Sequence, residues 1–250
     1  YLSSEITKDR YKVTPPNRTM YKRIVSELPC IRRWDAAPEL PGAPEFGRFL
    51  TKQGILPAIS HTMAEYEDVK AGFDAGFTHA AQLYNSMPGF HKRREYKYEG
   101  TVESVLLIDE MTTEVIADCV HLPPTILRLV YKLKGVSRTA LVTAALRYAA
   151  YDGEELAFSK VYIENGVCKL KSDGTVAGGI STMDQLVRNM VIRAEVPLED
   201  AVRMASETPA RIMNVIDRVG TLEKGKDADI LLLDKQYHIT SVWSKGVKMV

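Results

Sequence analysis

From residue 19 onward the chain alternates segments with helical periodicity and short apolar segments typical of strands. The predicted helices are 19–27, 43–54, 63–75, 123–134, 182–193, 198–206 and 208–215. The predicted strands between them are 30–39, 55–60, 77–83, 113–119 and 139–143. Strands that alternate with helices of this length form βαβ units, and these units build a parallel sheet. The sequence therefore predicts an α/β protein.

The number of β/α units indicates an incomplete barrel. Five units are clear and a sixth near residues 174–180 is possible, whereas a (β/α)8 TIM-type barrel has eight. Because the end of the chain has a distinct all-β character, we expect the missing strands at the N-terminal side. A hairpin is predicted over 158–171, where Asn165-Gly166 supplies a two-residue turn. We predict a barrel portion over 1–218 and separate C-terminal strands over 219–250.

Composition excludes several classes of protein. The 33 basic and 32 acidic residues give a formal net charge of +1, which argues against binding to nucleic acid or an anionic membrane. No apolar run approaches the ~18 residues of a membrane-spanning helix. The three cysteines show no CxxC spacing, and the first residues lack a signal-peptide pattern. We therefore expect a cytoplasmic protein.

Polar residues lie where the predicted parallel strands end. Right-handed crossovers bring these ends to one edge of the sheet, where α/β barrels carry their active sites. The residues at these ends are Glu39, His61, Gln82 with Asn85, Asp118 with His121, and Thr143-Ala144. The sequence thus predicts one site built from several strand ends.

Several segments resemble the N-acetylglucosamine-6-phosphate deacetylase family of the amidohydrolase superfamily. They are "APELPG" (37–42), "SHTMAEYEDVKAGFDAGFTHAAQLYNSMPG" (60–89), "VIADCVHLPP" (115–124), "LVTAAL" (141–146), "GTVAGGISTMDQLVRNMV" (174–191) and "MASETPARIM" (204–213). "GTLEKGKDADILLLD" (220–234) is shared more widely in that superfamily. The resemblance implies a (β/α)8 barrel with a small β-sandwich, to which strands 219–250 contribute.

The resemblance also implies hydrolysis of the acetamide of an amino-sugar phosphate with a divalent metal of the Zn or Fe class. In the family the metal is held by a glutamate and two histidines, and an aspartate moves the proton. The first histidine falls on His61, the second on Gln82, and the aspartate on Ala144, while the glutamate motif would precede Tyr1. An amide binds metals more weakly than imidazole, and a methyl group moves no proton. These departures predict doubtful metal binding and impaired activity.

The positions that hold the substrate in the family are better retained. Those implied here are Asn85, Ser86, Arg93 or Arg94, His121, Ala177 and Gly178. In the family a dimer partner supplies a further arginine, so a homodimer is expected.

Some residues have a second interpretation. Glu39 is either a substitute ligand or structural, and His79 and His238 are expected to be structural. His91 is expected to be solvated, and the basic run 91–95 either binds phosphate or forms a solvated face. Two other functions stay open: a non-catalytic sugar-phosphate binder, and a different amidohydrolase such as a cyclic-amide hydrolase. The segments "LYNSMPG" and "GISTMDQLVRN" argue against the latter.

Overall fold

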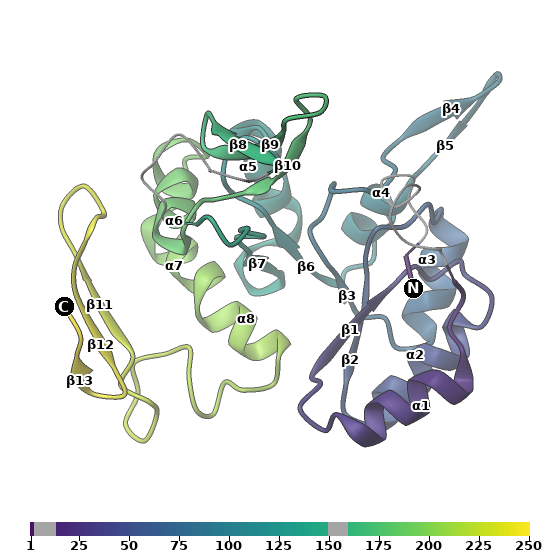
Figure 1. Cartoon of the computed structure of the whole chain (residues 1–250), viewed down its shortest axis with the longest axis horizontal. Coiled ribbons are helices and arrows are strands. Elements are labelled where there is room, and N and C mark those ends of the chain that lie inside the picture. The colour runs from purple at the N-terminus through teal and green to yellow at the C-terminus, as the bar shows by residue number, and fades with distance from the viewer. Residues whose placement is uncertain (3–13, 150–159) are drawn as a thin grey trace. The chain divides into compact units, whose positions relative to one another are not determined.

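The computed structural model describes residues 1–2, 14–149 and 160–250. By its contacts the chain divides into two compact units, Tyr1–Glu114 and Val115–Val250. The boundary between them falls inside strand β6 (Thr112–Val115), and the parallel strands have the order β1-β2-β3-β6-β7 (Figure 1). Each unit is described by itself below.

The first unit is a parallel sheet with helices packed on it. Its strands are β1 (Arg33–Ala36), β2 (Leu56–Ile59), β3 (His79–Ala80) and the start of β6. Its helices are α1 (Arg18–Glu27), α2 (Ala43–Lys52), α3 (Tyr66–Asp74) and α4 (Thr101–Leu107). The register places Asp35 opposite Ala58, Ala58 opposite His79, and His79 opposite Thr112.

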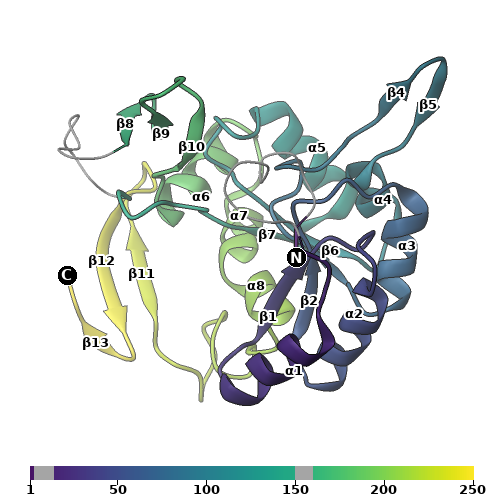
Figure 2. The ribbon, with the colours of Figure 1, turned by 45° about the vertical axis from the view of Figure 1, so that its right-hand side comes forward.

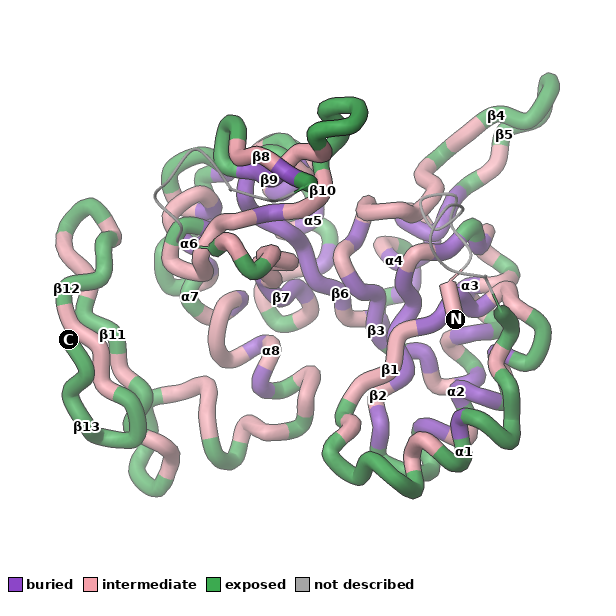
Figure 3. The backbone as a smooth tube through the Cα atoms, viewed as in Figure 1, coloured by how far each residue is buried: buried purple, intermediate pink, exposed green. Residues whose placement is uncertain are grey.

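One face of this sheet forms an apolar core with the helices. Trp34 meets the ring of Phe46 on α2 edge-on at 5.3 Å, and Tyr21 on α1 lies 4.9 Å from the same ring. Phe46 is completely buried, as are Ala36 and Ile59 on the sheet (Figure 3). This packing follows from the alternation of side chains along a strand, which sends residues 34 and 36 to the same side.

The opposite face carries a buried cluster of charges. Arg33 donates to Asp35 at 2.6 Å and to Glu114 at 2.8 Å, and His79 Nε2 lies 3.4 Å from the Glu114 carboxylate. Arg33 on β1 thus reaches across β2 and β3 to Glu114 on β6. Glu114 and His79 are almost fully buried. A charge on Glu114 is therefore stable only because its hydrogen-bond partners, above all the Arg33 guanidinium, compensate it.

A hairpin that the sequence analysis did not predict extends from the first unit. Strands β4 (His91–Arg93) and β5 (Tyr96–Tyr98) pair with each other around a turn at Arg94 and Glu95 (Figure 2). No Gly or Asn marks this turn, so the usual sequence signal of a two-residue hairpin is missing. The segment between the predicted strands 77–83 and 113–119, for which no element was predicted, therefore contains this hairpin and α4.

The second unit combines the end of the parallel sheet with helices and two antiparallel sheets. It contains β7 (Thr139–Leu141), the helices α5 (Pro124–Lys134), α6 (Met183–Ile192), α7 (Leu198–Ala205) and α8 (Glu207–Ile212), and the short 3-10 helix η2 (Val136–Arg138). One sheet has the order β10-β9-β8, built from β8 (Val161–Glu164), β9 (Val167–Leu170) and β10 (Val176–Gly179). The other is β11 (Ile230–Leu233), β12 (Ile239–Ser244) and β13 (Val247–Lys248). Among the described residues, none of the helices has the length and apolar character needed to cross a bilayer.

The structure confirms the predicted α/β class and the predicted helices, and it corrects several strands. The hairpin at Asn165-Gly166 is confirmed, although positions 158 and 159 of the predicted range lie outside the described residues. The strands predicted over 30–39 and 77–83 are much shorter, so Glu39 and Gln82 lie in turns beyond β1 and β3. The possible sixth strand, β10, pairs antiparallel with β9, and only Gly179 makes a parallel bridge, to Ala145. The described residues form no closed barrel.

Candidate active site

Four parallel strands are followed by a residue with left-handed backbone. These residues are His61 after β2 (φ 45°), Gln82 after β3 (φ 48°), Cys119 after β6 (φ 63°) and Ala144 after β7 (φ 45°). Residues other than glycine rarely adopt this conformation, which is strained by about 1 kcal/mol or more and occurs preferentially at functional sites. Among the positions after these strands, the backbone therefore marks the predicted site positions 61, 82 and 144, and adds position 119.

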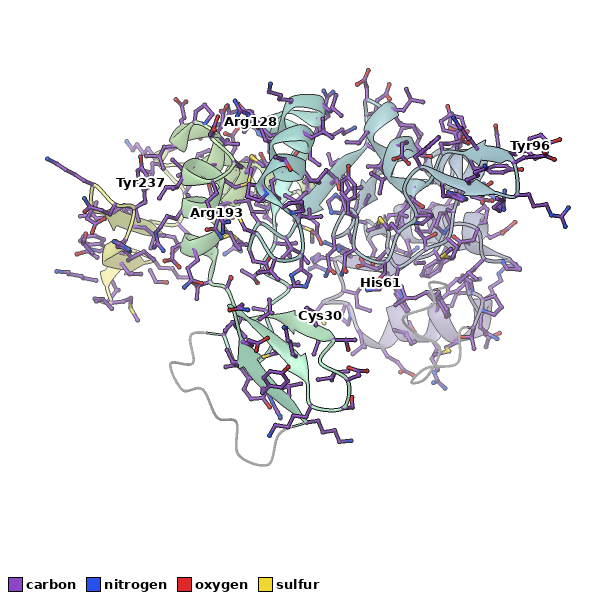
Figure 4. All side chains as sticks on the ribbon, turned by 90° about the horizontal axis from the view of Figure 1, so that it is seen from above. Cys30, His61, Tyr96, Arg128, Arg193 and Tyr237 are labelled. Carbon is purple, nitrogen blue, oxygen red and sulfur yellow. The ribbon has the colours of Figure 1, made fainter. Side chains whose placement is uncertain are left out.

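In the first unit, His61 is held by the chain around it (Figure 4). Its Nδ1 lies 2.8 Å from the hydroxyl of the buried Ser60. Burial lowers the pKa of the imidazole, and the nearby Asp35 carboxylate only partly opposes this shift. At neutral pH the ring is therefore uncharged.

Glu39 fixes the segment that follows His61. One carboxylate oxygen accepts a hydrogen bond from the Thr62 hydroxyl at 2.5 Å, and the other accepts the backbone N–H of Met63 at 2.8 Å. Both oxygens are thus engaged, which supports the structural interpretation of Glu39 over the interpretation as a substitute metal ligand.

We expect Glu39→Ala to lower the free energy of unfolding by about 2 kcal/mol, because two donors lose a charged acceptor. Urea denaturation followed by circular dichroism measures this. The control is Glu45→Ala on α2, whose side chain is 68% exposed and pairs only with Arg48 at 3.7 Å. Equal effects of the two substitutions would contradict the bracing role of Glu39.

Gln82 and Asn85 bind each other. The Asn85 side-chain amide donates to Gln82 Oε1 at 2.8 Å, and the Asn85 backbone N–H donates to the Gln82 carbonyl oxygen. Tyr84 and Ser86 also have positive φ, and the Ser86 hydroxyl oxygen is buried without a partner in the described part of the chain. This turn therefore presents polar groups, one of which has unused hydrogen-bonding capacity.

The residues predicted to hold a metal do not fit that role in the described part of the chain. No group of three or more His, Cys, Asp or Glu side chains there is arranged to hold a metal ion. Oε1 of Gln82, the atom that could bind a cation, already accepts the Asn85 amide. His61 is the one predicted ligand position that retains an imidazole.

The structure distinguishes the two candidate phosphate-binding arginines. Arg93 contacts Glu65 at 2.8 Å and lies over the ring of Tyr98 at 3.9 Å. Arg94 occupies the exposed turn of the hairpin, with φ 55°. His91, which was expected to be solvated, is partly exposed at 32%. Its Nδ1 also bonds the Gly89 carbonyl oxygen, and its ring stacks on Tyr98.

In the second unit, Asp118 and His121 form a close pair after β6. Asp118 Oδ2 lies 2.6 Å from His121 Nδ1, and Asp118 Oδ1 accepts the backbone N–H groups of Val120 and His121. Burial alone would raise the pKa of Asp118, but the hydrogen bonds from His121 and from the backbone outweigh it and lower the pKa. The carboxylate is therefore ionised and orients the imidazole ring.

Gly179 at the end of β10 lies beside this pair. A methyl group on Gly179 would be 3.2 Å from the Thr143 carbonyl oxygen, 3.6 Å from Asp118 Oδ2 and 3.8 Å from His121 Cε1. Ala144 follows Thr143, and the Leu146 N–H donates to the Gly179 carbonyl oxygen. Ala177 and Gly178, the other predicted substrate positions in this unit, lie on β10, where Gly178 contacts Leu146.

Sequence reasoning missed some residues that support the site. Asn189 on α6 donates to the Ala117 carbonyl oxygen at 3.0 Å and so braces the chain before Asp118. Ser60 and Thr62 hold the chain around His61. In the sequence, only their nearness to the quoted motifs pointed to these residues. A sequence does not show hydrogen bonds between residues that are far apart along the chain.

Comparison with known proteins agrees with this arrangement. The Amidohydrolase family matches residues 55–250, and the chain belongs to this family, whose members use a divalent metal. The relatives found include N-acetylglucosamine-6-phosphate deacetylase from Lysinibacillus sphaericus, 32% identical over 85% of this chain and 57% of the relative. An N-acetylgalactosamine-6-phosphate deacetylase from Escherichia coli is 34% identical over 84% of this chain and 55% of the relative. The family resemblance of the sequence is thus confirmed.

Solved structures show the same likeness. The N-acetylglucosamine-6-phosphate deacetylase from Pasteurella multocida superposes with a TM-score of 0.88 at 26% identity, covering 100% of this chain and 65% of that one. An aspartate-to-alanine variant of the Mycobacterium smegmatis enzyme, in complex with N-acetyl-D-glucosamine-6-phosphate, has a TM-score of 0.84 at 30% identity over 93% and 61% of the two chains. The chain spans about half the length of the curated relatives it matches.

Proposed function

We propose that this chain carries the substrate-binding part of an amino-sugar 6-phosphate deacetylase. The reaction is hydrolysis of the acetamide of N-acetylglucosamine 6-phosphate to glucosamine 6-phosphate and acetate. The observation that carries the proposal is the left-handed backbone at positions 61, 82 and 144, two or three residues after the ends of parallel strands. Strained backbone of this kind occurs preferentially at functional sites, and this class of fold binds ligands at the carboxyl ends of its strands.

The proposal includes a reduced rate of hydrolysis. Gln82 and Ala144 occupy the positions where the family resemblance implies a metal-binding histidine and a proton-transferring aspartate. The polar residues that the resemblance assigns to the substrate, including Asn85 and His121, are retained. The Mycobacterium smegmatis variant supports this combination, since a member of this family holds its substrate after losing an aspartate.

We also infer that the parallel strands belong to a (β/α)8 barrel and that residues 219–250 contribute to a small β-sandwich. The superposition on the Pasteurella multocida enzyme supports this architecture. A homodimer, a cytoplasmic location, and the domain boundary at residues 218 and 219 stay predictions.

The test is a titration with glucosamine 6-phosphate, followed by an assay of acetate release from N-acetylglucosamine 6-phosphate. Binding in calorimetry together with acetate release above the enzyme-free rate supports the proposal. Absence of both overturns it. N-acetylgalactosamine 6-phosphate in parallel reports which amino sugar the site prefers.

We expect Arg93→Ala to weaken binding of glucosamine 6-phosphate about 10- to 100-fold. The guanidinium of Arg93 is held in place by Glu65 and Tyr98, so it can bond the phosphate at little further loss of side-chain entropy. The control is Arg94→Ala at the exposed turn, which we expect to change affinity less than twofold. A larger loss in Arg94→Ala would assign the phosphate to Arg94 instead.

A second candidate is a sugar-phosphate binder without catalysis. The bond between Gln82 and Asn85 favours it, because the pair is satisfied without a metal ion. Binding of glucosamine 6-phosphate with no acetate release above background would support this candidate.

A further inference from the structure

The second unit contains an Asp–His pair of the kind that general bases use. Asp118 Oδ2 and His121 Nδ1 are 2.6 Å apart, and the Asp118 side chain is 1% exposed. The His121 side chain is 14% exposed, so one side of the ring remains accessible. Asn189 holds the backbone before Asp118 through the Ala117 carbonyl oxygen. The backbone N–H groups of Val120 and His121 hold the Asp118 carboxylate.

The hydrogen bonds determine which imidazole nitrogen carries the proton. Asp118 is ionised and can only accept, so Nδ1 of His121 must donate to it. In the neutral ring Nε2 is then left with a free lone pair. A histidine oriented in this way by a buried carboxylate is the arrangement that general-base catalysis requires.

Gly179 places no side-chain bulk beside the ring. It has no side chain where a Cβ would lie 3.8 Å from His121 Cε1. Ala144, at the position of the family's aspartate, contributes only a methyl group. The Asp118–His121 pair thus offers an oriented imidazole, whereas position 144 offers no group able to exchange a proton.

We propose that His121, positioned by Asp118, is the proton acceptor and donor in the residual hydrolysis, an inference that rests on the proposed function. Nε2 takes a proton from water as the water oxygen bonds to the acetamide carbonyl carbon, whose π electrons move to oxygen. The resulting imidazolium gives that proton to the nitrogen. The oxyanion then re-forms the C=O bond as the C–N bond breaks with its electrons on nitrogen. This releases the amine and acetic acid, and the acid loses its proton to water or to the amine to give acetate.

The experiment includes a pH profile, because proton transfer by a positioned side chain makes the rate depend on pH. In the described part of the second unit, the titratable and charged groups near His121 include Asp118 and Cys119, and Arg193 lies close to Cys119. Burial raises the pKa of the Cys119 thiol, which therefore stays neutral over the acid range.

The experiment measures kcat and KM for acetate release between pH 5 and pH 9. We expect His121→Gln to lower kcat ~100- to 10,000-fold, the usual contribution of a positioned base, and to change the pH dependence of kcat. KM and the affinity for glucosamine 6-phosphate should change much less than kcat does. Asp118→Asn should lower kcat ~10-fold or more and also change its pH dependence, which a merely structural role would not do.

The chain supplies a matched control in a second Asp–His pair. Asp234 and His238 are 3.3 Å apart, and the His238 side chain is 59% exposed. We expect His238→Gln to leave both the rate and the pH profile unchanged.

Three outcomes would overturn the inference. The first is a His121→Gln protein that binds glucosamine 6-phosphate and keeps the parent rate and profile. The second is a parent protein that binds glucosamine 6-phosphate but releases no acetate, which leaves the binding function intact. The third is a parent protein that neither binds nor turns over, which removes the proposed function as well.

Discussion

Ala144→Asp is expected to raise kcat for acetate release at least 100-fold over Ala144→Asn. Position 144 lies three residues after the end of β7 and has a left-handed backbone with φ 45°. A carboxylate there could exchange a proton with the reacting water, which contributes ~100- to 10,000-fold, whereas an amide of the same shape cannot. The measurement is acetate release at saturating N-acetylglucosamine 6-phosphate.

Asparagine is the matched control because it has the same backbone preferences. Asp and Asn tolerate a left-handed backbone better than Ala does, so both variants should be at least as stable as the parent protein. Ala144→Gly should also gain stability, by less than about 1 kcal/mol, without a gain in rate. Equal rates for Ala144→Asp and Ala144→Asn would show that position 144 lies away from the reacting atoms.

The Ala144→Asp variant also distinguishes the role of position 144 in proton transfer from the role of His121. If both groups can accept the proton, adding His121→Gln to Ala144→Asp should lower the rate much less than it does in the parent background. A full loss in the double variant would mean that His121 has a further role, such as orienting the carbonyl group.

Glu114→Gln is expected to lower the free energy of unfolding by about 3–5 kcal/mol. The Glu114 side chain is 9% exposed and accepts hydrogen bonds from Arg33 and His79, so the substitution leaves the partly buried Arg33 with less compensating charge. Urea denaturation at pH 7 measures the change. Asp74→Asn is the control, since the Lys70–Asp74 pair is exposed and its loss should change the free energy of unfolding much less.

The pH dependence of this difference follows from the pKa of Glu114. Burial alone would raise the pKa, but the hydrogen bonds from His79 and Arg33 and the Arg33 charge lower it to about 2, below its ordinary value of 4.5. The stabilisation by the carboxylate is therefore complete above about pH 4.5 and is lost as the pH falls toward 2. If the difference in free energy of unfolding between the parent protein and Glu114→Gln stays constant over that pH range, the ionised Glu114 does not stabilise the fold in this way.

The sequence by itself determined the elements whose signals are local. Helical periodicity predicted all the helices of the parallel sheet except α4, and Asn165-Gly166 predicted the hairpin β8–β9, because both depend on neighbouring residues. Motif spacing placed His61, Gln82, His121 and Ala144 near strand ends, and the family match confirms the resemblance behind it. The lengths of β1 and β3 were overestimated because an apolar run continues past the last ladder hydrogen bond.

Tertiary structure alone decided what depends on partners distant in sequence. Arg33 and Glu114 are 81 residues apart, and only the sheet register brings them together. The left-handed backbone at Gln82 and Ala144 carries no glycine or asparagine signal, since surrounding packing imposes it against local preference. The orientation of His121 likewise depends on Asp118 and on Asn189, whose helix begins more than sixty residues later along the chain.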